Sequence, residues 1–479
     1  MIYVKLNEDN FEYDIYSLVK AFYPKQEVKI GTAEPPVDEE ILFTMDVQYS
    51  NNVLTLDGRK IDIDYSNRPD TKNRLKLAIY ESLSQRTGKD LPWGTLTGIR
   101  PTKISLGMIE EGASDADVTA YMRQTYLASK EKIDLSLQVS HKEHELLSKI
   151  DYDNGYSVYI GIPFCPSTCL YCSFTSYPIG LWTKKLDDYI DALEKEMAFT
   201  AQACKEKSLT TIYIGGGTPT SLDAEHLDRL LTLIDKYFDT HSLLEYTVEA
   251  GRPDSITKEK LQVMRNHPVT RISINPQTMN QKTLDLIGRF HKVEDIHRVF
   301  GWARELGFKN INMDLILGLP GETIEDVAYT LSEVEKLAPD NLTVHSLALK
   351  HSARLNYDKE AYEDYLVENS QKHMDICLEA AKRMNMSPYY LYRQKNMAAN
   401  LENIGYATEG NEGLYNILIM EEKQTIMALG AGCACKFVAD HGKTVTRCEN
   451  VKDVQLYMDR IDEMIERKRE RLREDLKWL

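Results

Sequence analysis

Three cysteines stand close together in the segment Cys165-Pro-Ser-Thr-Cys169-Leu-Tyr-Cys172, a C-x3-C-x2-C spacing. Three thiolates on one short loop can bind three corners of a cubane iron–sulfur cluster. The fourth iron of such a cluster has no protein ligand, and an open metal position allows a small molecule to coordinate and react there. The same spacing also permits a structural zinc ion with a distant fourth ligand, or three buried thiols.

A glycine-rich segment, Gly-Gly-Gly-Thr-Pro at residues 215–219, follows the next apolar stretch of the chain. Glycines let the backbone approach a ligand closely and present its N–H and C=O groups. A tight strand-to-helix turn is the alternative explanation. Because the carboxyl ends of parallel strands meet at one edge of a sheet, this segment and the cysteine loop are expected to face one pocket.

Polar side chains recur at the ends of later apolar segments: Glu249, Gln277 and Asp314, with Arg289 in a loop beyond a short helix. An acid in a buried strand is costly unless it is paired or bound to a ligand. A structural hydrogen bond or a surface salt bridge explains each of them singly. Their recurrence at one end of a sheet favours a shared ligand site.

From about residue 156, short apolar strands alternate with amphipathic helices, which predicts an α/β fold with a parallel sheet. Such a series either curls toward a barrel or opens into a doubly wound sheet. One expected helix spans Leu222–Phe238, with Ser221 as its N-cap. The expected strands are Val158–Ile162, Thr211–Ile214, Tyr246–Glu249, Arg271–Ile274, Ile311–Leu315 and Leu342–Leu347.

The flanking regions have a different pattern, and we predict three domains: an N-terminal α/β domain of unknown role (1–150), the core (151–349) and a C-terminal domain that covers the substrate (350–479). In the first, Val53–Leu56 and Ile61–Tyr65 indicate a hairpin across the turn dipeptide Asp57-Gly58. Further expected elements are strands at Ile2–Leu6 and Ile41–Gln48, and helices at Leu75–Gln85, Asp115–Ala128, Ser140–Ile150, Tyr362–Met384 and Val451–Leu476.

Composition limits the function. The chain has 479 residues with 58 basic and 74 acidic side chains, a net charge of −16, which argues against a general nucleic-acid or membrane-surface binder. No apolar run approaches the ~18 residues needed to span a bilayer. Eight cysteines in so long a chain are too sparse for a disulfide scaffold. We therefore expect a cytoplasmic protein without a membrane span, in which clustered cysteines serve metal or redox chemistry.

With these residues in hand, the chain resembles the radical S-adenosylmethionine (SAM) proteins of the oxygen-independent coproporphyrinogen III oxidase family. The motifs are Tyr159-Ile-Gly-Ile-Pro-Phe-Cys165 with the two following cysteines, Gly-Gly-Gly-Thr-Pro, and Asp314-Leu-Ile-Leu-Gly-Leu-Pro-Gly-Glu-Thr. The N-terminal extension, with Trp-Gly-Thr-Leu-Thr-Gly-Ile-Arg-Pro-Thr-Lys at 93–103, is most similar to the HemZ-type coproporphyrinogen dehydrogenase branch. The resemblance implies a partial (β/α)6 barrel.

The resemblance also implies the cofactors, a [4Fe-4S] cluster and SAM, and the residues that bind them. Cys165, Cys169 and Cys172 would bind the cluster, and Tyr159 would lie near the cluster and SAM as a catalytic residue. The other SAM contacts would be Gly216, Gly217, Thr218, Glu249, Gln277, Arg289, Asp314 and Ala348. Among these, charge suggests that Arg289 binds the carboxylate and Asp314 a ribose hydroxyl, and Ala348 would flank the adenine.

The activity implied by the resemblance is the oxidative decarboxylation of coproporphyrinogen III in haem biosynthesis. A reduced cluster would split SAM, and the resulting 5′-deoxyadenosyl radical would take a hydrogen atom from a propionate. Loss of CO2 and one electron would leave a vinyl group, and two such events would give protoporphyrinogen IX. The implied partners are the porphyrinogen substrate and a one-electron donor such as a flavodoxin or ferredoxin.

Two departures from the family pattern concern the substrate. The coproporphyrinogen oxidases have a further cysteine two places after the triplet, where this chain has Phe174, and the family histidine between the Tyr-Ile and Ile-Pro pairs is Gly161 here. The Cys-x-Phe form resembles the haem-chaperone branch, which binds haem. The alternatives are therefore a haem-trafficking protein with a retained cluster, or a radical SAM enzyme that acts on another substrate.

Other residues have less specific interpretations. Cys433 and Cys435 form a C-x-C pair that could be a second metal or redox site, although packing of small residues is the simpler interpretation. Cations are needed to bind propionates, and each candidate is more simply a surface charge. These candidates are Arg100, Lys103, Lys350, Arg354, Arg393 and Lys395.

Overall fold

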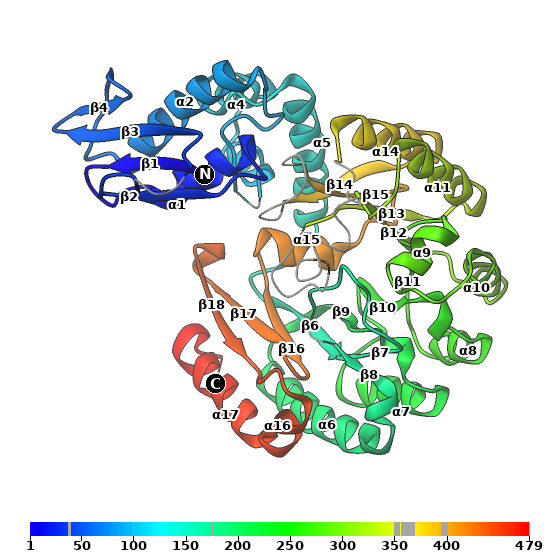
Figure 1. Cartoon of the computed structure of the whole chain (residues 1–479). Helices are drawn as coiled ribbons and strands as arrows, with labels where there is room; N and C mark the ends of the chain where they lie inside the picture. The colour runs from blue at the N-terminus through cyan, green and yellow to red at the C-terminus, as the bar shows by residue number, and fades with distance from the viewer. Residues whose placement is uncertain are drawn as a thin grey trace. The chain divides into compact units, whose positions relative to one another are not determined.

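The computed structural model of the chain (Figure 1) describes residues 1–36, 40–98, 100–174, 176–348, 355, 369–393 and 401–478. They form two compact units. One consists of Met1–His141 with Leu391–Glu402, and the other of Lys142–Tyr390 with Asn403–Leu479. The three domains predicted from the sequence, with their roles, stay a prediction.

The first unit contains a five-stranded sheet in the order β2-β1-β3-β4-β5. Its strands are β1 (Ile2–Leu6), β2 (Val28–Gly31), β3 (Phe43–Ser50), β4 (Val53–Leu56) and β5 (Arg59–Asp62). Its helices are α1 (Glu12–Phe22), α2 (Arg68–Thr87), α3 (Thr102–Glu110) and α4 (Asp115–Tyr126), and α5 (Lys130–Leu147) begins in it. The predicted hairpin is confirmed: Asp57 and Gly58, with φ of 47° and 84°, join β4 to β5 in the left-handed conformation that a two-residue type I′ turn requires.

Arg393 also belongs to the first unit, and the surface interpretation of this residue was wrong. It is 3% exposed and donates a hydrogen bond to the carbonyl oxygen of Leu96 at 2.6 Å. Burial lowers its pKa to about 10. Lys350, Arg354 and Lys395 lie outside the described residues.

The second unit contains an eleven-stranded sheet, whose central part is six parallel strands in chain order, β6-β9-β10-β11-β12-β13. These are β6 (Gly155–Ile162), β9 (Ser208–Gly216), β10 (Glu245–Gly251), β11 (Arg271–Ile274), β12 (Ile311–Leu317) and β13 (Asn341–Ser346). The connecting helices are α6 (Leu186–Ala203), α7 (Ala224–Tyr237), α8 (Lys258–Asn266), α9 (Gln281–Leu286), α10 (Val293–Glu305) and α11 (Ile324–Leu337).

The order of these strands decides between the two architectures that the sequence left open. A doubly wound sheet reverses its strand order at a switch point, whereas these six strands continue in one direction. Figure 1 shows α6, α7, α8, α10 and α11 along the outside of the strands, as in a curling (β/α) barrel. The barrel is partial, because β6 and β13 each pair with an extension instead of with each other.

The extensions come from the C-terminal part of the chain. Beside β13 lie β15 (Asn403–Ala407) and β14 (Ser387–Tyr392), and beside β6 lie β16 (Thr425–Leu429), β17 (Ala434–Ala439) and β18 (Thr444–Glu449). In the described residues of this part, the helices are α14 (Gln371–Arg383), α15 (Leu414–Glu421), α16 (Val454–Asp459) and α17 (Ile461–Arg471), followed by a π turn at Leu472–Leu476.

The six predicted core strands are confirmed, but several predicted helix boundaries were wrong. The helix predicted to begin at Ser140 begins at Lys130, and the one predicted to begin at Leu75 begins at Arg68. Asp223, not Ser221, caps α7 by accepting a hydrogen bond from the backbone N–H of His226 at 2.9 Å. Asn369 and Ser370 are non-helical, so α14 begins at Gln371. The predicted terminal helix is interrupted at Arg460. Among the described residues, none of the helices has both the length and the apolar character needed to cross a bilayer.

A buried ion pair joins α17 to α6. The Lys468 ammonium and the Glu196 carboxylate form a salt bridge in which both side chains are 0% exposed. Glu196 also accepts hydrogen bonds from Tyr457 Oη at 2.6 Å, Asn450 Nδ2 at 2.8 Å and the backbone N–H of Gly430 at 2.8 Å. This network fixes the turn between β16 and β17, which contributes residues to the site described below.

Candidate metal and cofactor site

The cysteine triplet lies on the loop that follows β6. Cys165 ends the short strand β7 (Phe164–Cys165), which pairs with β8 (Tyr177–Pro178) and so closes the loop at its base. In the middle of the loop, the backbone N–H of Leu170 donates to the carbonyl oxygen of Ile287 at 3.0 Å. All three cysteines are free thiols; Cys165 and Cys169 are buried and Cys172 is partly buried. The loop is thus held at both ends and in its centre.

The donor set fits an iron–sulfur cluster. Burial raises the pKa of the Cys165 thiol and raises the pKa of Cys172 to about 11, so binding to a positive metal centre is needed to stabilise the thiolates. In the described part of the chain, no three His, Cys, Asp or Glu side chains converge on a point where one metal ion would bind them all. A cubane cluster, unlike a single ion, binds each thiolate at a separate corner.

The glycine-rich segment packs directly on the entrance of the cysteine loop. The backbone N–H of Thr218 donates to the carbonyl oxygen of Phe164 at 2.7 Å, and the Thr218 hydroxyl lies 3.4 Å from the Cys165 sulfur. A Cβ atom on Gly217 would lie 2.6 Å from Phe164 O and 3.0 Å from Cys165 Sγ. Gly216 has a φ of +111°. Both positions therefore require glycine for the two loops to meet.

An aromatic stack forms the wall of the site on the inner face of the sheet. Because β6 and β9 are in register, Tyr159 lies opposite Tyr213, and their rings stack with centroids 6.0 Å apart. Tyr415, from α15, stacks on both, at 6.2 Å from Tyr159 and 4.6 Å from Tyr213. Burial raises the pKa of all three phenols well above its usual value, so they stay protonated.

The two acids predicted for the site, Glu249 and Asp314, interact with each other across the inner face of the sheet. Burial and the charge of Asp314 raise the pKa of Glu249 to about 8. The pKa of Asp314 is lowered: burial raises it, but hydrogen bonds and the charge of His345 outweigh that effect. A Cβ atom at position 215 would lie 2.8 Å from Glu249 Oε2, so Gly215 makes room for this carboxyl. The pair presents one ionised acid and one carboxyl that a cationic ligand would ionise.

Gln277 and Arg289 have buried polar atoms that lack partners, as expected for a site that binds a polar ligand. Gln277 has a φ of +67° and its Oε1 atom has no hydrogen-bond partner. Arg289 donates to the carbonyl oxygen of Asn275 at 2.6 Å and to Tyr171 Oη at 3.1 Å, while its Nε atom has no partner. Tyr171 belongs to the cysteine loop, so Arg289 links the two parts of the site. These features fit the carboxylate, amine and hydroxyl groups of SAM.

The structure thus brings the predicted residues to one end of the sheet. The cysteine loop, Gly216, Gly217 and Thr218 are in direct contact, and Tyr159, Glu249 and Asp314 lie on the inner face of strands β6, β10 and β12. Ala348 lies two residues beyond the end of β13.

Three functional candidates were missed from the sequence. Arg252 is 4% exposed and donates to Cys169 Sγ at 3.6 Å. His291 is 1% exposed, and both of its ring nitrogens lack a partner. His345 lies on β13, with Nε2 3.9 Å from Asp314 Oδ2. All three are basic side chains on or close after the strands of the site, and this much is visible in the sequence. The sequence does not show which residues they contact.

Gly161 and Cys433 occupy the same space from two segments of the chain. A Cβ atom on Gly161 would lie 2.3 Å from Cys433 Sγ. Cys435 instead contacts the backbone N–H and carbonyl oxygen of Ala428, at 3.2 and 3.5 Å. The two thiols of the C-x-C pair therefore occupy different environments, and Cys433 fills the volume that the missing side chain at position 161 leaves.

We expect Gly161→Ala to destabilise the protein by about 1–3 kcal/mol, because the added methyl group overlaps the Cys433 sulfur. Cys433→Ala removes that sulfur, and in the double variant most of the loss should be recovered. Denaturant unfolding of the four proteins of this double-mutant cycle gives the coupling free energy. Additive losses would show that the clash lies elsewhere.

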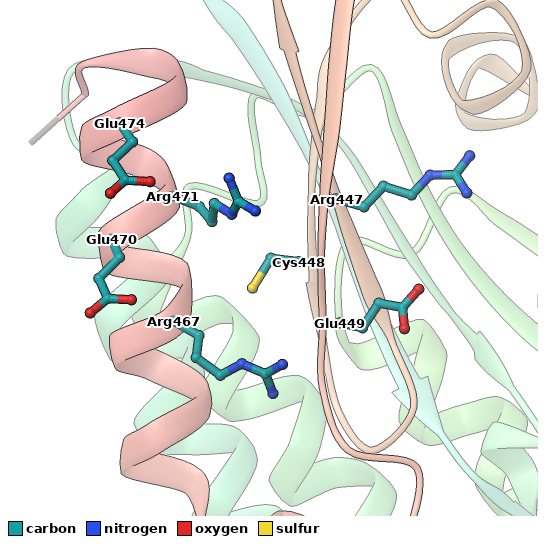
Figure 2. A pocket seen from close by; sticks show the side chains of 7 residues that line it. All are labelled: Arg447, Cys448, Glu449, Arg467, Glu470, Arg471 and Glu474. Atoms are coloured by element: carbon teal, nitrogen blue, oxygen red, sulfur yellow. The ribbon is translucent and has the colours of Figure 1, made fainter.

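A hollow of about 480 Å³, away from the residues predicted for the site, lies on the surface of the second unit between β18 and the C-terminal helix (Figure 2). It is lined by Arg447, Cys448, Glu449, Arg467, Glu470, Arg471 and Glu474. Figure 2 shows the Cys448 sulfur between Arg467 and Arg471. Three arginines and three glutamates line it, so the formal charge of the lining is zero.

Comparison with known proteins identifies the family. Residues 159–334 match the model of the Radical SAM superfamily. The chain is 36% identical over 483 residues to the Oxygen-independent coproporphyrinogen-III oxidase-like protein HemZ of Bacillus subtilis (strain 168), covering 97% of this chain and 96% of that protein. The chain belongs to the HemZ-like coproporphyrinogen oxidase family. The resemblance inferred from the motifs is therefore confirmed, as is the [4Fe-4S] cluster and SAM as the cofactors of this class.

The chain is also similar to a further curated protein and to a solved structure. It is 34% identical to the Heme chaperone HemW of Bacillus subtilis (strain 168), over 64% of this chain and 76% of that protein. The solved structure of coproporphyrinogen III oxidase (HemN) from Escherichia coli, described as a radical SAM enzyme, superposes with a TM-score of 0.52 at 24% identity, covering 65% of this chain and 70% of that chain. This likeness supports the radical SAM fold.

Proposed function

We propose that this HemZ-like protein is a radical SAM enzyme that converts propionate side chains of coproporphyrinogen III to vinyl groups and so gives protoporphyrinogen IX. The observation that carries the proposal is the direct contact between the cysteine loop and the glycine-rich segment, beside a cavity that Tyr159, Gly216 and Phe174 line. Each propionate, –CH2–CH2–COO−, would become –CH=CH2 and CO2 by giving one hydrogen atom to the 5′-deoxyadenosyl group derived from SAM and one electron to a one-electron acceptor.

The proposed cofactor-binding residues would contact different parts of the cluster and of SAM. Cys165, Cys169 and Cys172 would hold the cluster. Gly216, Gly217 and Thr218 would lie along the methionine part of SAM, Arg289 would bind its carboxylate and Asp314 a ribose hydroxyl. The remaining proposed SAM contacts are Tyr159, Glu249, Gln277 and Ala348. When bound, the cluster and SAM supply a one-electron route for removing a hydrogen atom from an unactivated C–H bond.

A cavity of about 340 Å³ supports the placement of a substrate beside these residues. Tyr159, Gly161 and Gly216 line it, together with Tyr415 and Phe174. Aromatic and aliphatic walls suit the apolar body of a pyrrole ring and exclude water from a reacting carbon. The full lining is Tyr159, Gly161, Pro163, Ser173, Phe174, Gly216, Tyr415, Ile419, Ile426, Ala428, Ala431, Gly432, Cys433, Ala434 and Lys436.

Lys436 contributes a cation to this lining. Its ammonium lies 3.1 Å from Glu422 Oε1 and 3.1 Å from the carbonyl oxygen of Ile419, which position it at the end of α15. A propionate carboxylate needs such a cationic hydrogen-bond donor when it leaves water. We assign Lys436 the role of orienting one propionate.

A haem-trafficking protein is the second candidate function, and the observation that favours it is Phe174. This residue stands where the oxidases of the family have a further cysteine, and its side chain is 70% exposed at the cavity. An exposed apolar ring beside the cofactor site is suited to contact a flat macrocycle. The 34% identity to the Heme chaperone HemW is in keeping with this candidate.

One anaerobic experiment separates the two functions. The reconstituted protein is incubated with SAM, dithionite and coproporphyrinogen III, and 5′-deoxyadenosine, CO2 and vinyl porphyrins are quantified. We expect all three products, with the Cys169→Ala variant as the control that yields none. The same protein is titrated with haem in parallel: stoichiometric haem binding without CO2 release from coproporphyrinogen III would favour the trafficking function. The absence of 5′-deoxyadenosine at full cluster occupancy would rule out the enzyme. The flavodoxin or ferredoxin donor and the cytoplasmic location stay predictions.

A further inference from the structure

Arg252 donates hydrogen bonds to the cysteine loop. It follows β10 directly, and its Nη1 atom donates to the carbonyl oxygen of Ser167 at 2.8 Å, to Ser167 Oγ at 2.9 Å and to Cys169 Sγ at 3.6 Å. The Asp254 carboxylate accepts hydrogen bonds from the other edge of the guanidinium, from Nε at 3.0 Å and from Nη2 at 2.7 Å. The guanidinium is therefore fixed in orientation, with one edge on the carboxylate and the other on the loop.

The charges around the loop are unequal. Arg252 and Arg289, 4% and 3% exposed, bring two positive charges, whereas Asp254 brings one negative charge. Burial raises the pKa of Asp254, but the hydrogen bonds and charge of Arg252 outweigh this and keep it below its usual value, so the carboxylate is ionised. Burial and the charge of Arg289 lower the pKa of His291 to about 4, so this imidazole adds no charge near neutral pH.

This surplus of positive charge matches what the cluster needs. A [4Fe-4S]2+ core with three thiolates carries one negative charge, and reduction by one electron adds a second. Hydrogen bonds to the thiolate sulfurs and the local charge are among the factors that set the reduction potentials of such clusters. A buried guanidinium on a ligand sulfur acts in a low-dielectric environment, where its effect is larger than at the surface.

We propose that Arg252 sets the reduction potential of the cluster, stabilising the reduced state through its N–H bond to the Cys169 sulfur and its positive charge, while Asp254 orients it and moderates its charge. Arg252 is then a positioning and tuning residue, not a catalytic one. The proposal concerns the cluster alone and does not depend on which substrate the protein accepts.

The test is a redox titration of the reconstituted protein without SAM or porphyrin, with dithionite as the one-electron donor and the EPR signal of the reduced cluster as the readout. For Arg252→Gln we expect the ratio of reduced to oxidised cluster at a fixed potential to fall at least tenfold, a shift of about 59 mV to more negative values for one electron. For Asp254→Asn we expect the opposite sign, because the amide oxygen still accepts a bond from Arg252 but its charge is gone.

A matched control is Arg229→Gln. Arg229 lies on α7 in exposed ion pairs with Asp187 and Asp191, so this variant has the same change in net charge at a solvent-screened position and should leave the potential unchanged. Opposite shifts for Arg252→Gln and Asp254→Asn are not produced by general loosening of the loop, which would lower the iron and sulfide content of both.

Unchanged potential in Arg252→Gln with full iron and sulfide content would overturn the proposal. If Arg252→Gln binds no cluster, Asp254→Asn decides: a positive shift supports the role of Arg252, and no shift or a negative one contradicts it. Arg252→Lys is the additional variant, for which a shift smaller than that of Arg252→Gln is expected, because the charge remains while the fixed N–H bond to sulfur is lost.

Discussion

Cys169→Ala is expected to abolish the brown iron–sulfur absorbance of the anaerobically reconstituted protein. Cys169 is the central thiol of the triplet, is 7% exposed, and lies on a loop pinned through Leu170 and Arg252. Without it, two thiolates remain to hold a cube that has only three protein ligands. Iron and sulfide should fall from about four of each per chain to near zero.

The matched control is Cys433→Ala. This thiol is also buried, at 8% exposed, but its sulfur lies beside Gly161 on β6 and not on the triplet loop. Absorbance and metal content should stay nearly unchanged. Loss of colour in both variants would show that the C-terminal cysteine pair also binds the metal centre, and zinc in place of iron would contradict the cluster assignment.

Lys468→Met is expected to lower the free energy of unfolding by about 3–5 kcal/mol, the cost of leaving a buried carboxylate without its counter-ion. Glu196 and Lys468 are 0% exposed, so no water replaces the missing ammonium. The Lys468 ammonium also donates to the carbonyl oxygen of Ala428 on β16, and this bond is lost as well. Denaturant unfolding of the cofactor-free protein measures the effect.

The double variant Glu196→Gln/Lys468→Met gives the control. With the acid neutralised, the amide oxygen can still accept from Tyr457 Oη and the backbone N–H of Gly430, the two donors on Glu196 Oε2, and much of the lost stability should return. An effect of Lys468→Met below about 1 kcal/mol, the range of surface pairs, would show that the pair is solvated in the folded protein. Full additivity of the two substitutions would show that the groups do not interact.

Much of the fold could be predicted because it depends on local patterns. Short apolar segments such as Ile311–Leu315 are typical of buried strands. The dipeptide Asp57-Gly58 favours the left-handed backbone conformation of a two-residue turn. The elements missed from the sequence include α1, β2 and α3. In α1 the residues Ile15, Leu18, Val19 and Phe22 have helical spacing, so its pattern was present in the sequence and was overlooked. Helix ends were less well predicted, because residues close in sequence, such as Ser221 and Asp223, are both good N-caps. Tertiary contacts determine which of them caps the helix.

The site divides in the same way. The cysteine spacing, the glycine run and the polar residues at strand ends are visible in the sequence, because parallel strands place successive strand ends at one edge. The strand register then adds what no spacing contains: it stacks Tyr159 on Tyr213 and leaves Gly215 open for Glu249. Tyr415 on α15, which is distant in sequence, completes this stack, and no sequence motif predicts its position there.

The sequence by itself determined that this protein has a parallel α/β core and a three-cysteine loop suited to an iron–sulfur cluster, because both follow from short-range periodicity and spacing. Only the tertiary structure decided that Arg252 bonds to Cys169, that Cys433 fills the space beside Gly161, and that Lys468 neutralises Glu196. These pairs are separated by many residues, and a buried charge or a filled volume is defined by which segments pack together, not by the order of residues along one segment.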